Sequence, residues 1–200
     1  MSPQIKVTYF DGPGRAELTR LALAAGGVAF EDERVTFADF GALKPTLPLG
    51  QLPVVTVDGK VYPQSMAMAR YAGRLSGLYP TDALEALNVD MIIETVAEVA
   101  AALAEIKWRT PEEADKVEKI KALKDEKLPK FFGLVESTIK GKYLLGDKLS
   151  LADLYLFDVY TNSLILTAPD YDVAVFPKIA AVIEGVKAEP NVAAYLAKRQ

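Results

Sequence analysis

The sequence predicts a two-domain α+β protein, in which a βαβαββα domain is followed by an all-α helical bundle. Strand and helix signals alternate through residues 1–77, whereas only helical periodicity follows in residues 84–200. Residues 78–83 contain Pro80 and Asp82 and form the expected linker. The chain has 200 residues, enough for two small domains that each bury a core.

Turn and cap residues delimit the first two elements. The β-rich segment 5–10 stops at Asp11-Gly12-Pro13-Gly14, so it is the expected first strand. Apolar residues then recur at helical spacing from Leu18 to Ala25, and Gly26-Gly27 is expected to end this helix.

The rest of the first domain ends in a hairpin and a helix. A strand over 31–35 and a short helix around 40–44 come first. Asp58-Gly59 is typical of a two-residue hairpin turn, so we expect strands at 53–57 and 60–62. A helix then begins at Ser65, and the complete order is that of a thioredoxin-like domain.

Helix-start signals divide the second domain. After a long helix over 83–107, Thr110-Pro111-Glu112-Glu113 predicts an N-cap, a first-turn proline and a capping-box glutamate. Pro129 is expected to kink the following helix, and Ser150 with Asp153 predicts a second capping box. The helix after Ser150 is apolar nearly all round, so it is the expected buried centre of the bundle. Two final helices are expected over 177–188 and 190–198.

The composition excludes several kinds of chemistry. A net charge of −4 offers no basic surface for nucleic acid, and no apolar run approaches the length of a membrane span. The first residues lack the charged and apolar regions of a signal peptide, so we expect a cytoplasmic protein. The absence of cysteine and histidine removes disulfides, thiolate metal sites and the usual general base.

Tyr9 is the most informative residue, because it stands where a thioredoxin-like domain would carry its reactive cysteine. A redox scaffold without a thiol has to obtain sulfur from a bound molecule, which points to glutathione as co-substrate. A thiol pKa of ~8.5 leaves little thiolate at neutral pH, and lowering it by about two units requires roughly 2.7 kcal/mol. A phenol hydrogen bond to the sulfur, aided by a cation, would supply that free energy. The alternative is a strand-end aromatic that completes the core.

Several motifs resemble those of the cytosolic glutathione transferases, and they are most similar to the sigma class. The matching pieces are Tyr9-Phe10 with Gly14-Arg15-Ala16-Glu17, Gly50-Gln51-Leu52-Pro53, Gln64-Ser65 and Ser150-x-x-Asp153. The resemblance spans essentially the whole chain in the right order. It implies a cytoplasmic homodimeric detoxification enzyme that joins glutathione to hydrophobic electrophiles, with peroxide reduction or isomerisation as side activities.

The resemblance assigns the residues around the sulfur. Tyr9 would stabilise the thiolate, and Arg15 would lie near the sulfur and assist its ionisation; the alternative for Arg15 is a surface salt bridge. In Gln51-Leu52-Pro53 the proline would be cis, so that the Leu52 backbone pairs with glutathione like an added strand. The alternative is a plain strand start. Pro13 departs from the polar residue common at its position, which would alter the substrate mouth.

The two carboxylates of glutathione need separate partners. The resemblance places the γ-glutamyl carboxylate on Gln64 and Ser65 at a helix N-terminus, where Ser65 would otherwise be an ordinary N-cap. Lys44 would bind the glycyl carboxylate together with residue 40. Phe40 replaces a tryptophan there and has no N–H, so we expect weaker glutathione binding by about 1 kcal/mol.

Three acidic residues, Asp90, Glu94 and Glu98, recur every four residues on the long helix. They would form either a solvated stripe or part of a dimer interface. In the second case the resemblance implies that Glu98 reaches the glutathione amino group bound to the partner subunit. Ala97 stands at a position that is acidic in metal-binding relatives, so no metal is expected.

The resemblance also implies a hydrophobic electrophile pocket between the domains. Its candidate residues, which would otherwise be mostly bundle core, are Phe10, Gly14, Leu103, Lys107, Trp108, Tyr155 and Val159. Two alternatives to a conjugating transferase stay open: a glutathione-dependent isomerase of the prostaglandin D synthase type, and a non-catalytic crystallin-like or ligand-carrier protein. The retained motif residues argue against a crystallin, which has no use for a complete thiol site.

Overall fold

The computed structural model describes residues 2–199 and divides the chain into two compact units. Among the described residues, one unit comprises 2–79 together with 190–199, and the other comprises 80–189. This division differs from the predicted helical domain of 84–200 in its last helix. The reason is that α10 (Pro190–Lys198) packs on α1 (Glu17–Ala25) of the first unit.

A four-stranded mixed sheet forms the base of the first unit. Its strands are β1 (Ile5–Phe10), β2 (Glu31–Val35), β3 (Val54–Val57) and β4 (Lys60–Pro63), in the order β2-β1-β3-β4. β1 runs parallel to β2 and antiparallel to β3, and β3 is antiparallel to β4. Asp58 and Gly59 adopt φ values of 50° and 83°, as a tight hairpin turn requires, so the predicted hairpin is confirmed.

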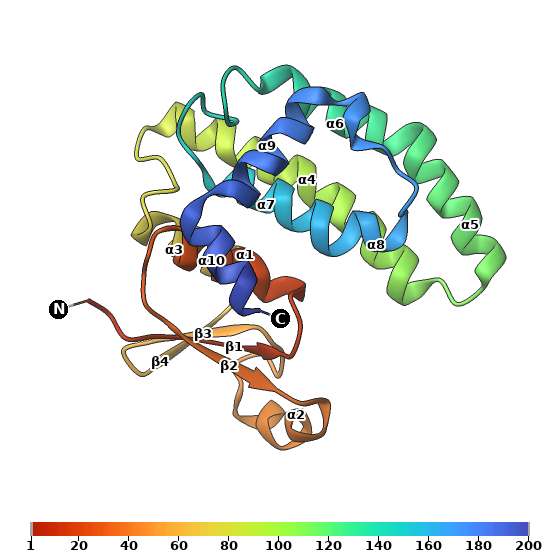
Figure 1. Cartoon of the computed structure of the whole chain (residues 1–200). Coiled ribbons are helices and arrows are strands. Elements are labelled where there is room, and N and C mark those ends of the chain that lie inside the picture. The colour runs from red at the N-terminus through yellow and green to blue at the C-terminus, as the bar shows by residue number, and fades with distance from the viewer. Residues whose placement is uncertain (1, 200) are drawn as a thin grey trace. The chain divides into compact units, whose positions relative to one another are not determined.

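Three helices cover one face of this sheet. Figure 1 shows α1, α3 (Ser65–Leu75) and α10 on the same side, and α1 packs on both α3 and α10. The remaining elements of the unit are η1 (Gly14–Ala16), α2 (Phe37–Leu43) and η2 (Lys44–Thr46). A methyl group on Gly26 would lie 2.3 Å from Ser76 Cβ, so glycine is needed where α1 ends against the end of α3. The predicted helix end at Gly26-Gly27 is therefore confirmed.

The second unit is helical. In chain order it contains α4 (Ala83–Arg109), α5 (Glu113–Ala122), the π-helix η3 (Leu123–Lys127), α6 (Leu128–Thr138), α7 (Leu151–Val159), the π-helix η4 (Tyr160–Leu164), α8 (Ile165–Thr167), η5 (Val173–Val175) and α9 (Pro177–Ala188). In α7 every residue is buried except Tyr155, and α7 packs on both α4 and α9 (Figure 1). The prediction that this helix forms the bundle centre is confirmed. Between residues 2 and 199, no helix is long and apolar enough to cross a membrane.

The Ser150–Asp153 capping box is present and buried. Asp153 Oδ2 accepts hydrogen bonds from the Ser150 N–H at 2.8 Å and from the Ser150 hydroxyl at 2.6 Å, and Oδ1 accepts one from the Leu144 N–H at 2.8 Å. Burial raises the pKa of Asp153 to about 6, although the three donors favour the carboxylate. The carboxyl group therefore joins the start of α7 to the loop before it.

One helix-start prediction for the second unit is wrong. Thr110 does not cap α5, which begins at Glu113; its hydroxyl donates instead to the Glu105 carbonyl at 3.1 Å and accepts from Lys119 Nζ at 3.2 Å. At Pro129 the expected irregularity takes the form of the π-helix η3, which ends two residues before the proline and leads directly into α6.

Candidate functional site

The sheet register brings three motif residues to one end of the first unit. Thr8 of β1 pairs with Val54 of β3, which pairs with Pro63 of β4. The next residue on each strand in the same direction is Tyr9, Pro53 or Gln64, because neighbouring strands in this part of the sheet are antiparallel. Segments far apart in the sequence thus meet along one edge.

Tyr9 is half-buried at the end of β1. A methyl group on Gly14 would lie 2.7 Å from both Tyr9 Cε1 and the Tyr9 hydroxyl oxygen, so the loop passes directly over the phenol. Gly14 has a φ of 44°, in the left-handed region that favours glycine. The Phe10 ring lies 5.4 Å from the Tyr9 ring in an edge-to-face arrangement. Tyr9 is therefore a partly accessible phenol held by its own loop, rather than a fully buried core aromatic.

Arg15 lies in η1 one residue after Gly14 and is exposed. No carboxylate of residues 2–199 forms a salt bridge with it, so the surface ion pair that was the alternative for Arg15 is not found among these residues. The exposed guanidinium of Arg15 is therefore available to an anionic ligand, and it lies close to Tyr9 in the chain.

Residues before β3 form the second part of the site. The Leu52–Pro53 peptide bond is cis, as expected. Gly50 has a φ of 57°, and a methyl group on it would lie 3.5 Å from Lys44 Cε, so the exposed Lys44 runs along this segment. The structure therefore places Lys44 against Gly50, the residue directly before Gln51.

Phe40 belongs to an aromatic cluster at the end of β1. Its ring lies 5.1 Å from that of Phe10, and Phe37 stacks on the other side of the cluster at 4.6 Å from Phe10. Phe37 is 82% exposed. Lys44, Phe40 and Phe10 consequently lie near one another in the first unit.

The third part is the N-terminus of α3. The N-cap residue is Gln64 and not Ser65, which is the first helical residue, and no side chain caps this end. The first-turn N–H groups and the positive end of the helix dipole are therefore open to an anion. Gln64 has a φ of 78°, a conformation that non-glycine residues rarely adopt and that is typical of functional sites.

The remaining predicted residues lie on helices of the second unit. Leu103 and Val159 are buried and Tyr155 is partly buried, whereas Lys107, Trp108 and Glu98 are exposed. Lys107 Nζ lies 4.9 Å above the Trp108 ring, and Trp108 is 76% exposed. An exposed tryptophan contacted by a cation is unusual for bundle core, which favours a role at a surface for the last turns of α4.

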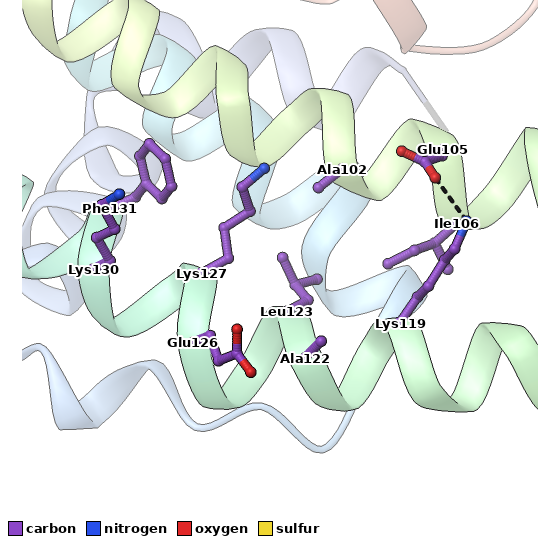
Figure 2. Close-up of a pocket in the computed structure, with 10 residues that line it drawn as sticks. All are labelled: Ala102, Glu105, Ile106, Lys119, Ala122, Leu123, Glu126, Lys127, Lys130 and Phe131. Carbon is purple, nitrogen blue, oxygen red and sulfur yellow. Dashed lines mark hydrogen bonds and ion pairs between the residues drawn. The ribbon is translucent and has the colours of Figure 1, made fainter.

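A cavity of about 400 Å³ lies between α4 and the α5–α6 segment, and Figure 2 shows the residues around it. Ala102, Ile106 and Leu123 give it an apolar floor, while Lys119 forms a 2.6 Å ion pair with Glu105 across its rim. None of the predicted electrophile residues lines this cavity.

Sequence reasoning missed a charged cluster beneath the Tyr9 loop. Glu17 and Arg20 are fully buried on α1, and Arg20 donates to the carbonyls of Gly12 at 2.8 Å and Pro13 at 3.3 Å. The sequence does contain a signal for this cluster. Glu17 and Arg20 are three residues apart, the spacing of a helical ion pair, and they lie in a helix that is otherwise mostly apolar.

Comparisons with known proteins identify the family. A family model described as the N-terminal domain of glutathione S-transferase matches residues 5–74, and one described as its C-terminal domain matches residues 97–199. A glutathione S-transferase of Anopheles gambiae is 34% identical over 98% of this chain and 97% of its own. The chain belongs to the glutathione S-transferase family. The predicted fold and the predicted transferase class are thereby confirmed.

Other relatives of this transferase carry two kinds of name. The hematopoietic prostaglandin D synthase of Gallus gallus is 31% identical over 98% of this chain and 97% of its own. Among solved structures, the sigma class transferase of Fasciola hepatica is 32% identical with a TM-score of 0.88, covering 100% of this chain and 98% of its own. The prostaglandin synthase D of Nilaparvata lugens is 32% identical, also with a TM-score of 0.88, and covers 99% of both chains.

Proposed function

We propose that this transferase holds glutathione at the edge formed by Tyr9, Pro53 and Gln64, and that Tyr9 activates its sulfur. The observation that carries the proposal is the sheet register, which aligns these residues in one row. The row offers a phenol donor, a strand edge beside the cis bond and an anion-binding helix end, in that order. A thiol tripeptide with two terminal carboxylates presents matching groups in the same order.

Each part of the row has one task. The α3 N–H groups with Gln64 and Ser65 bind the γ-glutamyl carboxylate, and the Leu52 backbone pairs with the cysteinyl backbone. Lys44 binds the glycyl carboxylate by charge, without an aromatic N–H because residue 40 is phenylalanine. Gln51 flanks this strand edge and completes the wall of the site.

The chemical step needs a thiolate at neutral pH. The Tyr9 hydroxyl donates a hydrogen bond to the sulfur, and the Arg15 cation adds favourable charge. The thiol proton is released to water, since Tyr9 keeps its own. The sulfur lone pair then attacks an electrophilic carbon of a hydrophobic substrate, a C–S bond forms, and the leaving group departs with the bonding electron pair. Phe10, Gly14, Leu103, Lys107, Trp108, Tyr155 and Val159 are the residues we propose for that substrate.

Conjugation of glutathione to an aryl halide tests the role of Tyr9. We expect Tyr9→Phe to lower kcat by about 10- to 100-fold, the equivalent of one charge-assisted hydrogen bond. The KM for glutathione should change little, because the phenyl ring keeps its packing. Tyr62→Phe, at an exposed tyrosine of the same unit, is the matched control. Full activity in Tyr9→Phe would remove Tyr9 from the mechanism.

We further propose a sigma class, cytoplasmic homodimer that acts in detoxification. Support comes from the sigma class relative of Fasciola hepatica and from exposed Glu98 on α4. If Glu98 contacts glutathione bound to the partner subunit, Glu98→Gln should weaken glutathione binding, whereas Glu94→Gln one turn away should not. This explanation requires that analytical ultracentrifugation shows a dimer. A monomeric protein, with wild-type affinity for glutathione in Glu98→Gln, contradicts it.

A second candidate function is a glutathione-dependent isomerase of the prostaglandin D synthase type. Relatives from Gallus gallus and Nilaparvata lugens that bear this name favour it. Incubation with a prostaglandin D precursor and glutathione distinguishes the candidates, because an isomerase returns glutathione unchanged and a conjugating enzyme consumes it. Tight glutathione binding with neither activity would instead indicate a ligand carrier.

A further inference from the structure

The C-terminal helix is joined to the Tyr9 loop through buried charges. Glu17, whose side chain is fully buried, accepts hydrogen bonds from the Tyr195 hydroxyl at 3.2 Å to each carboxylate oxygen and from the Arg199 guanidinium. Both donors lie in or directly after α10, more than 170 residues along the chain. The carboxylate is therefore shared between α1 and the C-terminus.

Arg20 carries this connection to the loop. It lies 3.5 Å from Glu17, and both side chains have no exposed surface. Arg20 Nε donates to Asp32 at 2.8 Å, while Nη1 donates to the Gly12 carbonyl at 2.8 Å and more weakly to that of Pro13. A buried guanidinium needs such partners, since removing one leaves an uncompensated charge. The Gly12 carbonyl also accepts from Arg34 Nη1 at 3.1 Å, so the loop is held by Arg20 together with Arg34, which pairs with the same Asp32.

The loop in turn defines the surroundings of the Tyr9 hydroxyl. Gly12 and Pro13 lead into Gly14, whose backbone touches the phenol, and the Arg20 guanidinium carbon lies 5.8 Å from the centre of the Tyr9 ring. A displacement of about 1 Å at a reacting group can reduce a rate about 100-fold. Small movements of this loop therefore matter to any chemistry at Tyr9.

We propose that Glu17, Arg20, Tyr195 and Arg199 form a latch by which the C-terminal helix positions the Tyr9 loop. These four are positioning residues, and the inference rests on the proposed function of Tyr9 in thiol activation. Arg199 binds Oε1 of Glu17, whereas Arg20 lies 3.5 Å from Oε2. Without Arg199, Glu17 keeps an ion pair only with Arg20 among residues 2–199, and Arg20 is drawn from the Gly12 and Pro13 carbonyls. The loop then relaxes away from the phenol.

Arg199→Ala tests the latch against two matched variants. Arg199→Lys keeps the cation, and Lys198→Ala removes an exposed neighbouring cation that forms no salt bridge within residues 2–199. We expect Arg199→Ala to lower kcat/KM for aryl halide conjugation about tenfold and to shift the pH at half-maximal kcat/KM upward. Arg199→Lys should retain most of the wild-type kcat/KM and most of the wild-type pH profile. Lys198→Ala should match the wild type in both measurements.

A readout independent of activity separates this inference from the proposed function. The amide NMR resonances of Gly12 and Gly14 should move in Arg199→Ala and stay in place in Lys198→Ala. If the wild type shows no conjugation, the proposed function fails while the resonances still report on the latch. Unmoved resonances overturn the latch, and moved resonances with a wild-type pH profile overturn its positioning role. If Arg199→Ala does not fold, Tyr195→Phe should give smaller shifts of the same resonances.

Discussion

Residue 40 provides a direct test of how the glycyl carboxylate is bound. Phe40 contacts Phe10 but offers no hydrogen-bond donor. Phe40→Trp adds an indole N–H beside Lys44, and we expect glutathione to bind about 1 kcal/mol more tightly, about fivefold in Kd. Isothermal titration calorimetry measures the change.

The matched control for that substitution is Phe37→Trp. Phe37 also stacks on Phe10, but it is largely exposed and is not a predicted glutathione residue. It should therefore leave the Kd for glutathione unchanged. An unchanged or weaker affinity in Phe40→Trp would show that the glycyl carboxylate is bound elsewhere.

At the scale of elements, the start of α7 depends on one buried carboxyl group. Asp153→Ala would leave the N–H groups of Leu144 and Ser150 without acceptors. Two unsatisfied buried donors lower the free energy of unfolding by about 3 kcal/mol. Urea denaturation measures this loss, and Asp147→Ala, at an exposed aspartate just before α7, should lose little. Equal losses in the two variants would contradict the assignment.

The same carboxyl group predicts a pH dependence. Its pKa is about 6 in the folded chain because it is buried, against an ordinary value of 3.8. Between these values the folded chain binds more protons, so the Asp153 contribution to the free energy of unfolding falls as the pH rises from about 4 to about 6. Urea denaturation of wild type and Asp153→Asn should show the difference shrinking over this range. A difference that grows with pH would contradict the raised pKa.

Most elements could be predicted because local residues decide them. Asp58-Gly59 favours a tight hairpin, and Gly27, with a φ of 66°, ends α1 through its own backbone conformation. The predicted N-cap at Thr110 was wrong because its hydroxyl contacts Lys119, and only the folded bundle brings the two residues together. The π-helix before Pro129 was not predicted either, because a change in helical hydrogen bonding leaves no residue pattern of its own.

At the scale of the whole molecule, glutathione should stabilise the folded chain. A ligand at 100 times its Kd adds about 2.7 kcal/mol to the free energy of unfolding when it binds only the folded state. Cysteinylglycine lacks the γ-glutamyl carboxylate expected at α3, so at the same concentration it should stabilise far less. Thermal or urea denaturation with each ligand measures this. Equal stabilisation by both ligands would contradict binding of the γ-glutamyl carboxylate by Gln64 and Ser65.

The candidate site was predictable as motifs but not as a connected structure. Tyr9, Pro53 and Gln64 stood out singly, and the sheet register explains why they lie together. The link from Arg199 to Glu17 could not be read from the sequence, since a C-terminal arginine and a helical glutamate are ordinary surface residues by type. Long-range pairing of charges depends on the tertiary fold, where α10 meets α1.

The positive φ of Gln64 sets stability against glutathione binding at this position. A φ of 78° is unfavourable for glutamine by about 1 kcal/mol, and a glycine would relieve it. We expect Gln64→Gly to unfold at higher urea than Gln64→Ala, while both lose glutathione affinity equally. Selection for thermal stability alone would therefore favour replacing Gln64 by glycine. In a stabilised variant of the enzyme, this position should be sequenced first if turnover is lost.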